Sequence, residues 1–196
     1  MQIDAIMALA IKKGSVRATD LNAIGANRTL LPYLAQRGLL RRIARGAYMP
    51  TDRIPEQGAF VEVAAVVPHG VFCLLSALQY HEITTQIPNE SWVAIERGTN
   101  VPSTVKTRIH IVKLTGTLFS SGIEEHQSDG VTVRVYSPAK TVVDCFRFRN
   151  RLGLDVAREA LTDCLAQRKA TRDEIWRYAK ICRMARIMRP YLEMAG

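Results

Sequence analysis

Arginine, glutamine, threonine and tyrosine side chains recur near the beginning of the chain, mostly between residues 28 and 48. Guanidinium groups bind phosphate and the edge of guanine, while amide and hydroxyl groups hydrogen-bond to base edges and to the sugar–phosphate backbone. The pattern therefore favours contact with nucleic acid over catalysis. The candidate DNA-contact residues are Thr19, Arg28, Thr29, Tyr33, Gln36, Arg37, Arg41, Arg42, Arg45 and Tyr48.

Three helix-sized segments carry or support these side chains. Apolar residues recur at three- and four-residue intervals from Ile3 to Ala10, which predicts a first helix that ends at Gly14. Residues 20–24 predict a short second helix, for which Thr19 and Asp20 are both candidate caps. Gly25 follows it and suits a left-handed turn between two helices.

Residues 27–37 predict the third helix, which we interpret as a recognition helix. If the helix starts near Asn27 or Thr29, Pro32 falls within its first turn, where a missing backbone N–H is tolerated. Leu30, Leu31 and Leu34 form an inward side. The polar candidates then face outward, as in a helix that lies in the major groove.

A basic hairpin follows this helix. Residues 39–43 and 47–49 predict two strands with Arg45-Gly46 at the tip. Arg41, Arg42 and Arg45 would make the hairpin a basic wing, although three arginines can also serve only to keep an edge strand soluble. Because the hairpin follows three helices, we favour a winged helix-turn-helix that binds DNA.

Positive charge is concentrated at the two ends of the 196-residue chain, whose formal net charge is +9. Residues 1–52 hold eight Lys and Arg against three Asp and Glu, residues 53–143 hold seven against eight, and residues 144–196 hold twelve against seven. This distribution favours a polyanionic partner. We predict an α+β protein with a winged helix-turn-helix domain at 1–52 and a C-terminal domain at 53–196, joined by a linker at 49–58.

The C-terminal domain is predicted to combine a small sheet, at about 90–136, with several helices, at about 137–194. Extended segments lie at 92–96, 108–113 and 131–136, whereas 71–80 predicts a helix and 124–130 a turn. Residues 60–67 are apolar enough for a buried helix or strand. Ser137-Pro138 is a helix start, residues 155–167 are helical in their periodicity, and Thr171 with Glu174 forms a capping box.

The last predicted helix, at about 172–188, has a basic side made of Arg177, Lys180, Arg183 and Arg186. Such a side is either the solvated face of an ordinary packed helix or a second contact surface. The second surface would bind DNA phosphate or an acidic partner protein. The residues alone leave both alternatives open.

Enzymatic, metal-binding and membrane functions find little support in the sequence. Four separated cysteines form no Cys-x-x-Cys pair, and the four histidines have no neighbours at ligand spacing. No secretory signal or apolar stretch long enough for a bilayer is visible. We expect a cytoplasmic protein with reduced cysteines and with no catalytic residues, metal or cofactor.

Several separated motifs resemble the AbiEi family of antitoxins, which belong to bacterial type IV toxin–antitoxin systems and act in abortive infection. The longest is Val-Arg-Val-Tyr-Ser-Pro-Ala-Lys-Thr-Val-Val-Asp-Cys-Phe at 133–146, which follows Gly-Ile-Glu-Glu-His at 122–126. Segments 168–171, 176–179 and 188–192 and the Arg-Gly-Ala-Tyr of the wing at 45–48 are also similar to that family.

The resemblance implies an N-terminal winged helix that binds operator double-stranded DNA and represses its own operon. It also implies a C-terminal domain that counteracts a co-encoded nucleotidyltransferase toxin, with or without a stable contact. An alternative is a protein-interaction module that binds its partner through the basic C-terminal helices and has only non-specific affinity for DNA. The operator sequence and the oligomeric state do not follow from the residues.

Overall fold

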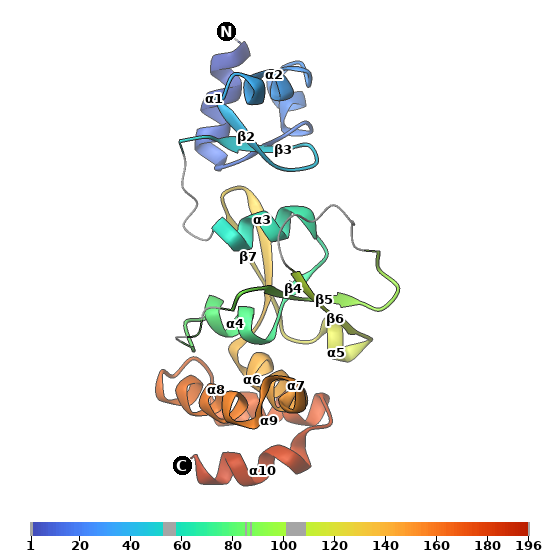
Figure 1. Ribbon diagram of the computed structural model, residues 1–196, viewed down its shortest axis with the longest axis vertical. Coiled ribbons are helices and arrows are strands. Elements are labelled where there is room, and N and C mark those ends of the chain that lie inside the picture. Colours follow the sequence, from blue (N-terminus) through green and yellow to red (C-terminus); the bar gives the residue numbers. More distant parts are fainter. Residues whose placement is uncertain (1, 53–57, 85, 87, 101–108, 196) are drawn as a thin grey trace. The chain divides into compact units, whose positions relative to one another are not determined.

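The structure is a computed structural model that describes residues 2–52, 58–84, 86, 88–100 and 109–195. The chain forms two compact units: Met1–Pro68 with His126–Val133, called unit 1, and His69–Glu125 with Arg134–Gly196, called unit 2 (Figure 1). Both helices and strands are present in quantity, so the predicted α+β class is confirmed.

Unit 1 contains the predicted winged helix-turn-helix. Its elements are α1 (Gln2–Lys13), β1 (Val16–Arg17), the 3₁₀ helix η1 (Asp20–Ile24), α2 (Leu30–Gln36), β2 (Leu40–Ala44), β3 (Ala47–Pro50) and α3 (Gly58–Val66). The strands form an antiparallel sheet in the order β1-β3-β2. Gly25 ends η1 with a left-handed φ of 62°, as the sequence predicts.

Most of the predicted inward residues form the core of this helical unit. Ile6, Leu31 and Leu34 are almost completely buried in one apolar cluster with Leu21, and Leu30 packs against it partly buried, whereas Ile3 at the start of α1 is 37% exposed. The recognition helix begins at Leu30, three residues after Asn27 and one after Thr29, the two starts that the sequence allows, because the Asn27 side chain accepts a hydrogen bond from the backbone N–H of Thr29 at 3.0 Å. Residues 27–29 therefore form a turn instead of helix.

The predicted linker at 49–58 is shorter in the structure. Met49 and Pro50 belong to β3, and Gly58 is the first residue of α3. Packing explains why both ends of the predicted linker belong to regular structure: Met49 and Pro50 are buried in β3, and α3 packs against β2. Residues 53–57 lie outside the described residues.

The remaining elements are β4 (Val71–Phe72), α4 (Leu74–Tyr80), β5 (Ser91–Glu96), β6 (Ile109–Leu114), α5 (Thr117–Ser120), β7 (Ile123–Ser128), β8 (Val131–Tyr136), α6 (Pro138–Arg147), α7 (Arg149–Leu152), α8 (Leu154–Ala166), α9 (Arg172–Ile181) and α10 (Ala185–Met194). The sheet order is β6-β5-β4-β8-β7. β4 is antiparallel to β5 and parallel to β8, and β5 is parallel to β6.

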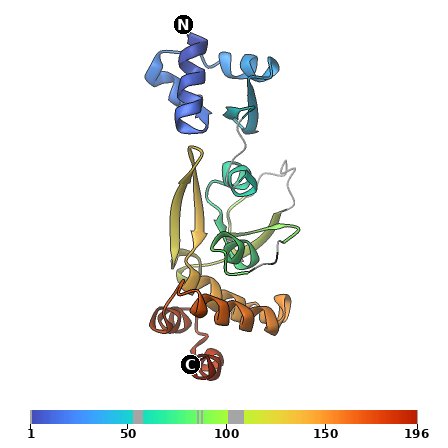
Figure 2. The same cartoon turned by 90° about the vertical axis from the view of Figure 1, so that its left-hand side faces the viewer.

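Two predictions in this region are wrong. Val71–Phe72 is a strand, not the first turn of a helix, because its backbone pairs with both β5 and β8. The predicted turn at 124–130 is mostly strand β7, and only Asp129 and Gly130, with φ values of 51° and 71°, form the turn to β8. Figure 2 shows β7 and β8 as one long two-stranded ribbon.

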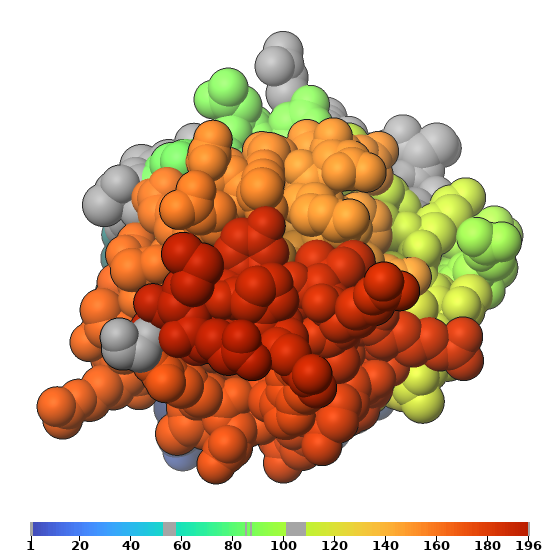
Figure 3. Space-filling view, turned by 90° about the horizontal axis from the view of Figure 1, so that it is seen from below, coloured from blue at the N-terminus to red at the C-terminus, as the bar shows by residue number. Residues whose placement is uncertain are grey.

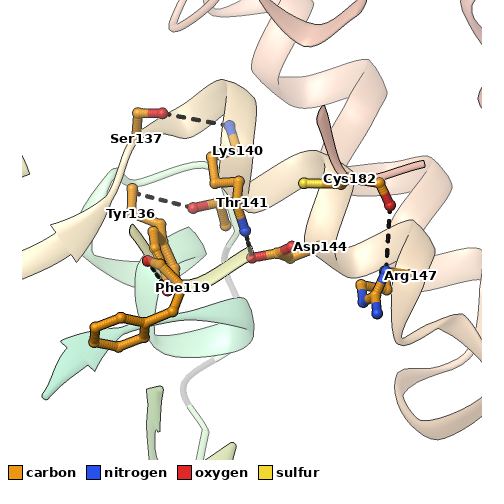
Figure 4. Close-up of polar contacts among 8 residues, drawn as sticks. All are labelled: Phe119, Tyr136, Ser137, Lys140, Thr141, Asp144, Arg147 and Cys182. Atoms are coloured by element: carbon orange, nitrogen blue, oxygen red, sulfur yellow. Dashed lines mark hydrogen bonds and ion pairs between the residues drawn. The ribbon is translucent and has the colours of Figure 1, made fainter. Parts of the chain in front are cut away.

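Helix α6 lies in the core of unit 2, where it packs against α4, α8 and α9. Ala139 to Phe146 are all buried. The predicted helix start is confirmed, since the Ser137 hydroxyl accepts a hydrogen bond from the backbone N–H of Lys140 and proline follows it (Figure 4). All four cysteines are buried and unpaired.

The predicted last helix at 172–188 is two helices, α9 and α10. Arg183 adopts a left-handed φ of 56°, and the backbone N–H of Met184 closes α9 by bonding to the Ala179 carbonyl at 2.7 Å. This break turns Met184, only 5% exposed, into the core. Figure 3 shows the continuous surface that α9 and α10 form at the C-terminal end of the chain.

Within the described part of the chain, no helix has the length and apolar character needed to cross a bilayer.

Candidate nucleic-acid interface

Helix α2 has one buried and one exposed side. Leu31 and Leu34 anchor it to the core of unit 1, while Tyr33, Gln36 and Arg37 are exposed on the other side. Arg37 donates from Nε to the Tyr33 hydroxyl at 3.1 Å, and its guanidinium carbon lies 5.3 Å from the centre of the Tyr33 ring. The pair therefore holds a guanidinium group in place on the exposed side of the helix.

Arg28 and Thr29 lie in the turn before α2, where both are exposed. The Arg28 side chain has no polar partner among the described residues, so its guanidinium is available to a ligand. The N-terminal end of a recognition helix is the part that meets base edges in helix-turn-helix proteins. The structure thus brings these two residues to the same end of the helix that the sequence predicts.

Thr19 and Asp20 do not act as caps in the predicted way. Thr19 precedes η1 and is exposed, but its side chain makes no capping hydrogen bond. Asp20 instead accepts hydrogen bonds from the Lys13 ammonium at 2.6 Å and from the Arg17 backbone N–H at 2.7 Å. Asp20 therefore ties the end of α1 to β1 and neutralises Lys13.

The carboxylate of Asp20 is held in its charged form. Partial burial raises the pKa of Asp20, but the hydrogen bonds from Lys13 and Arg17 outweigh this effect and the net pKa is lowered. The charge of Lys13 is consequently balanced within unit 1. The exposed arginines of α2 and the wing carry the remaining positive potential of this surface.

The three wing arginines differ in their surroundings. Arg45 lies at the hairpin tip and is exposed, with no polar partner among the described residues. Arg42 is also exposed and donates from Nε to the Ala44 carbonyl at 3.2 Å. The strand register shifts between Arg42 and Ala44, an irregularity that re-aims side chains near the tip of a hairpin.

Arg41 is the least available of the three. Its side chain is 35% exposed and forms an ion pair with Glu62 of α3 at 2.9 Å. A second nitrogen of the same guanidinium approaches the Met49 sulfur at 3.3 Å. Arg41 is thus committed to packing α3 against the wing.

Tyr48 is not on the surface. It is only 7% exposed and belongs to the apolar core of the helical unit. It lies opposite Val16 in the sheet and fixes β3 to the helices. We therefore omit Tyr48 from the proposed contact set.

Arg17 is a candidate that the sequence analysis missed. It is exposed on β1, directly opposite Ala47, the first residue after the wing tip. β1 therefore adds a fourth arginine to the basic hairpin. A strand of two residues is too short to show an alternation of apolar and polar side chains. The only signal for this strand in the sequence is the position of Val16-Arg17 directly after the first helix.

A second polar cluster lies buried in unit 2 and contains motif residues of the family resemblance (Figure 4). Lys140 and Asp144 form an ion pair at 2.5 Å, with side chains 0% and 2% exposed. The Lys140 ammonium also lies 4.3 Å from the centre of the Tyr136 ring, and the Tyr136 hydroxyl donates to the Phe119 carbonyl at 2.7 Å. The cluster thus joins α6 to β8 and α5.

Burial is the largest influence on the pKa values of this cluster. It raises the pKa of Asp144, although the Lys140 ammonium opposes this effect. Burial also raises the pKa of Tyr136 and of Cys145. None of these groups reaches the surface, so a macromolecule cannot touch them. We conclude that they position helix α6.

The predicted C-terminal basic side is divided by the break between α9 and α10. Arg177 and Lys180 lie on α9, Arg183 lies in the turn, and Arg186 lies on α10. All four are exposed. They therefore do not form the single helical stripe that the sequence predicts.

Glu124, Glu125 and His126, the densest cluster of acid–base groups in the sequence, lie on strand β7. Among the described residues, no group of three or more His, Cys, Asp or Glu side chains is arranged to hold a metal ion.

Residues 4–51 match the family of AbiEi antitoxin transcriptional regulators. This span runs from α1 to β3 and includes every candidate residue of the interface. The match confirms the predicted resemblance for the N-terminal segment and supports a role as an antitoxin or regulator. No curated protein matches the chain.

The fold of the whole chain has a counterpart among solved structures. The crystal structure of the RV2827C protein from Mycobacterium tuberculosis superposes with a TM-score of 0.62 over 98% of this chain and 76% of that protein, with 12% sequence identity. At this identity the likeness establishes the fold alone.

Proposed function

We propose that this protein is a cytoplasmic type IV antitoxin without enzymatic activity, which binds operator DNA and represses its own toxin–antitoxin operon. It also counteracts a co-encoded nucleotidyltransferase toxin. One observation carries the proposal: a segment that matches AbiEi transcriptional regulators presents exposed arginines on the helix and hairpin that contact DNA in winged-helix proteins.

In this mechanism, α2 lies in the major groove with its exposed side toward the bases. Arg28 and Arg37 are suited to guanine, because a guanidinium can donate two parallel hydrogen bonds to O6 and N7. Gln36 is suited to adenine for the corresponding reason. These residues supply sequence preference.

The wing supplies affinity. Arg45 and Arg42, with Arg17 beside them, contact phosphates or enter the minor groove. Such contacts release counterions and make binding sensitive to salt. They add little sequence information.

A gel-shift titration on the upstream DNA of the gene tests the proposal, with scrambled DNA of equal length as competitor and at two salt concentrations. We expect a preference for the upstream DNA that persists at the higher salt. Arg186→Ala on α10 is a matched control that removes one exposed arginine from unit 2 and should bind like the wild type. Equal, salt-labile binding to both DNAs would reduce the winged helix to a non-specific basic surface.

The alternative function is a protein-interaction module that acts through the exposed basic residues of α9 and α10. A full-length Arg28→Ala/Arg37→Ala/Arg45→Ala variant separates the two functions when it is co-expressed with the toxin. If operator binding is lost while protection from the toxin persists, neutralisation belongs to unit 2. Both activities then coexist in one chain.

A further inference from the structure

Unit 2 contains a groove whose lining residues Arg147 and Cys182 neighbour the buried Lys140 cluster. It is lined by Thr115, Gly116, Thr117 and Leu118 at the start of α5, by Arg147 at the end of α6, and by Ile181, Cys182 and Arg183 at the end of α9. Its volume is about 410 Å³. We propose that this groove binds the phosphate group of a nucleotide.

Two arginines from distant parts of the sequence line the groove. Arg147 donates to the Cys182 carbonyl at 3.2 Å, which holds its side chain against the end of α9 (Figure 4). Arg183 is placed there by the left-handed turn that breaks the predicted last helix. The break therefore places exposed Arg183 in the lining of the same groove as Arg147.

Positive charge dominates the walls of the groove. Acidic residues are not among the described residues that line it. Asp144, one turn before Arg147 on α6, is buried and ion-paired with Lys140, and the Arg147 charge also acts on its carboxylate. Two arginines against one carboxylate that is already paired leave a net positive charge, which attracts an anion, and guanidinium groups can bind phosphate oxygens in bidentate fashion.

The other walls fit a nucleotide better than a bare anion. Thr115 and Thr117 add hydroxyl groups, while Leu118 and Ile181 add apolar surface. The volume lies within the roughly 300–1,000 Å³ range of small-molecule sites, which exceeds what one phosphate fills. The nucleotide can be free or part of a nucleic-acid strand, because both offer the same phosphate chemistry.

Arg168 provides a matched control within unit 2. It follows α8 as Arg183 follows α9, with φ values of 55° and 56°. In both turns the next backbone N–H bonds back to the helix, from Lys169 to Cys164 at 2.9 Å and from Met184 to Ala179 at 2.7 Å. Arg168 is exposed and does not line the groove.

The test compares wild type, Arg183→Gly and Arg168→Gly in the full-length protein. Glycine is at ease in the left-handed conformation, so both variants should fold with unfolding midpoints no lower than that of the wild type. Calorimetric titration with inorganic pyrophosphate and, separately, with a 12-nucleotide single strand measures binding. We expect Arg183→Gly to weaken binding about ten-fold or more, because a charge-assisted hydrogen bond is lost, and Arg168→Gly to leave it within about two-fold.

Loss of pyrophosphate binding in Arg183→Gly alone shows that the groove binds the phosphate group of a free ligand. If pyrophosphate fails to bind but the single strand binds and is weakened by Arg183→Gly alone, the groove accepts backbone phosphate. Equal binding of both probes by all three proteins, or binding of neither probe by the wild type, would overturn the proposal. Operator preference is measured on different residues, so the two proposals fail independently.

Discussion

Unit 1 and the helices of unit 2 use arginine in different ways, although residues 1–52 and 144–196 carry the same net charge of +5. In unit 1, Arg28 and Arg45 lie exposed within 18 positions of each other, with no polar partner among the described residues. In unit 2, Arg147 donates to the Cys182 carbonyl and Arg149 to the Phe146 carbonyl, so both satisfy the ends of helices. Equal net charge therefore does not mean an equal binding surface.

The largest expected effect is a loss of stability in unit 2, where the buried charges have a structural role. Lys140→Met removes one partner of a fully buried ion pair and leaves the Asp144 carboxylate uncompensated. We expect the free energy of unfolding, measured with urea, to fall by about 3–5 kcal/mol.

The double variant Lys140→Met/Asp144→Leu is the control for this change. It removes both charges and should recover much of the lost stability, because an apolar pair needs no compensation. A loss below about 1 kcal/mol in the single variant would show that Lys140 does not hold α6 in place.

Two single substitutions, one in each unit, compare an exposed arginine of the recognition helix with an arginine that bonds to a helix end. Arg37→Ala should cost about 1–3 kcal/mol of binding to the operator and relax its sequence preference, with little change in stability. Arg149→Ala should instead cost about 1 kcal/mol of stability and leave DNA binding unchanged, because its bond to Phe146 lies within unit 2. Fluorescence anisotropy on operator and random DNA, together with urea unfolding, measures both.

Tyr33→Ala should act like Arg37→Ala, since the Tyr33 hydroxyl and ring hold the Arg37 guanidinium. Equal losses on operator and random DNA for these two variants would contradict their role in sequence preference.

A smaller effect is expected at the wing tip. Arg45→Ala should weaken binding to all DNA sequences alike and lower the slope of log K against log salt by about 1, because one phosphate contact is lost. Titrations at several salt concentrations measure the slope. Arg41→Ala is the control, since that guanidinium is already paired with Glu62; a larger slope change at Arg41 than at Arg45 would reverse our assignment.

The smallest effect concerns pH. The pKa of Asp20 is lowered in the folded state despite its partial burial, so its bonds to Lys13 and Arg17 add stability above the ordinary carboxyl pKa of about 4. This stability should disappear as the pH falls through the lower pKa of the folded state. Asp20→Asn should be less stable than wild type at pH 7, by about 0.5–1 kcal/mol, and equally stable near pH 2. A difference that persists unchanged at low pH would exclude Asp20 as its source.

Local signals made much of the fold predictable. The α1 periodicity, the turn at Gly25, the wing hairpin and the Ser137 and Thr171 caps all depend on neighbouring residues, and the structure confirms each of them. The match of residues 4–51 to AbiEi regulators confirms the predicted resemblance over the same segment. The individual DNA contacts stay predictions.

Signals that depend on distant residues were missed. Val71–Phe72 is a strand because the distant segments β5 and β8 pair with it on either side. β7 pairs with β8, which follows it directly in the sequence, but its residues are mostly polar. Both segments are short or polar, so their own residues do not show a strand pattern. Arg17 was missed for the same reason.

The sequence by itself determined the order of the winged-helix elements, the polar side chains that they carry and the helix caps, because helix periodicity, turn chemistry and capping act over a few residues. Tertiary structure alone decided which of those side chains are available. It buried Tyr48 and paired Arg41 with Glu62, and in unit 2 it brought Arg183 and Arg147 to the lining of one groove. Burial and ion pairing depend on which segments meet in space, and that is set by the packing of the whole core.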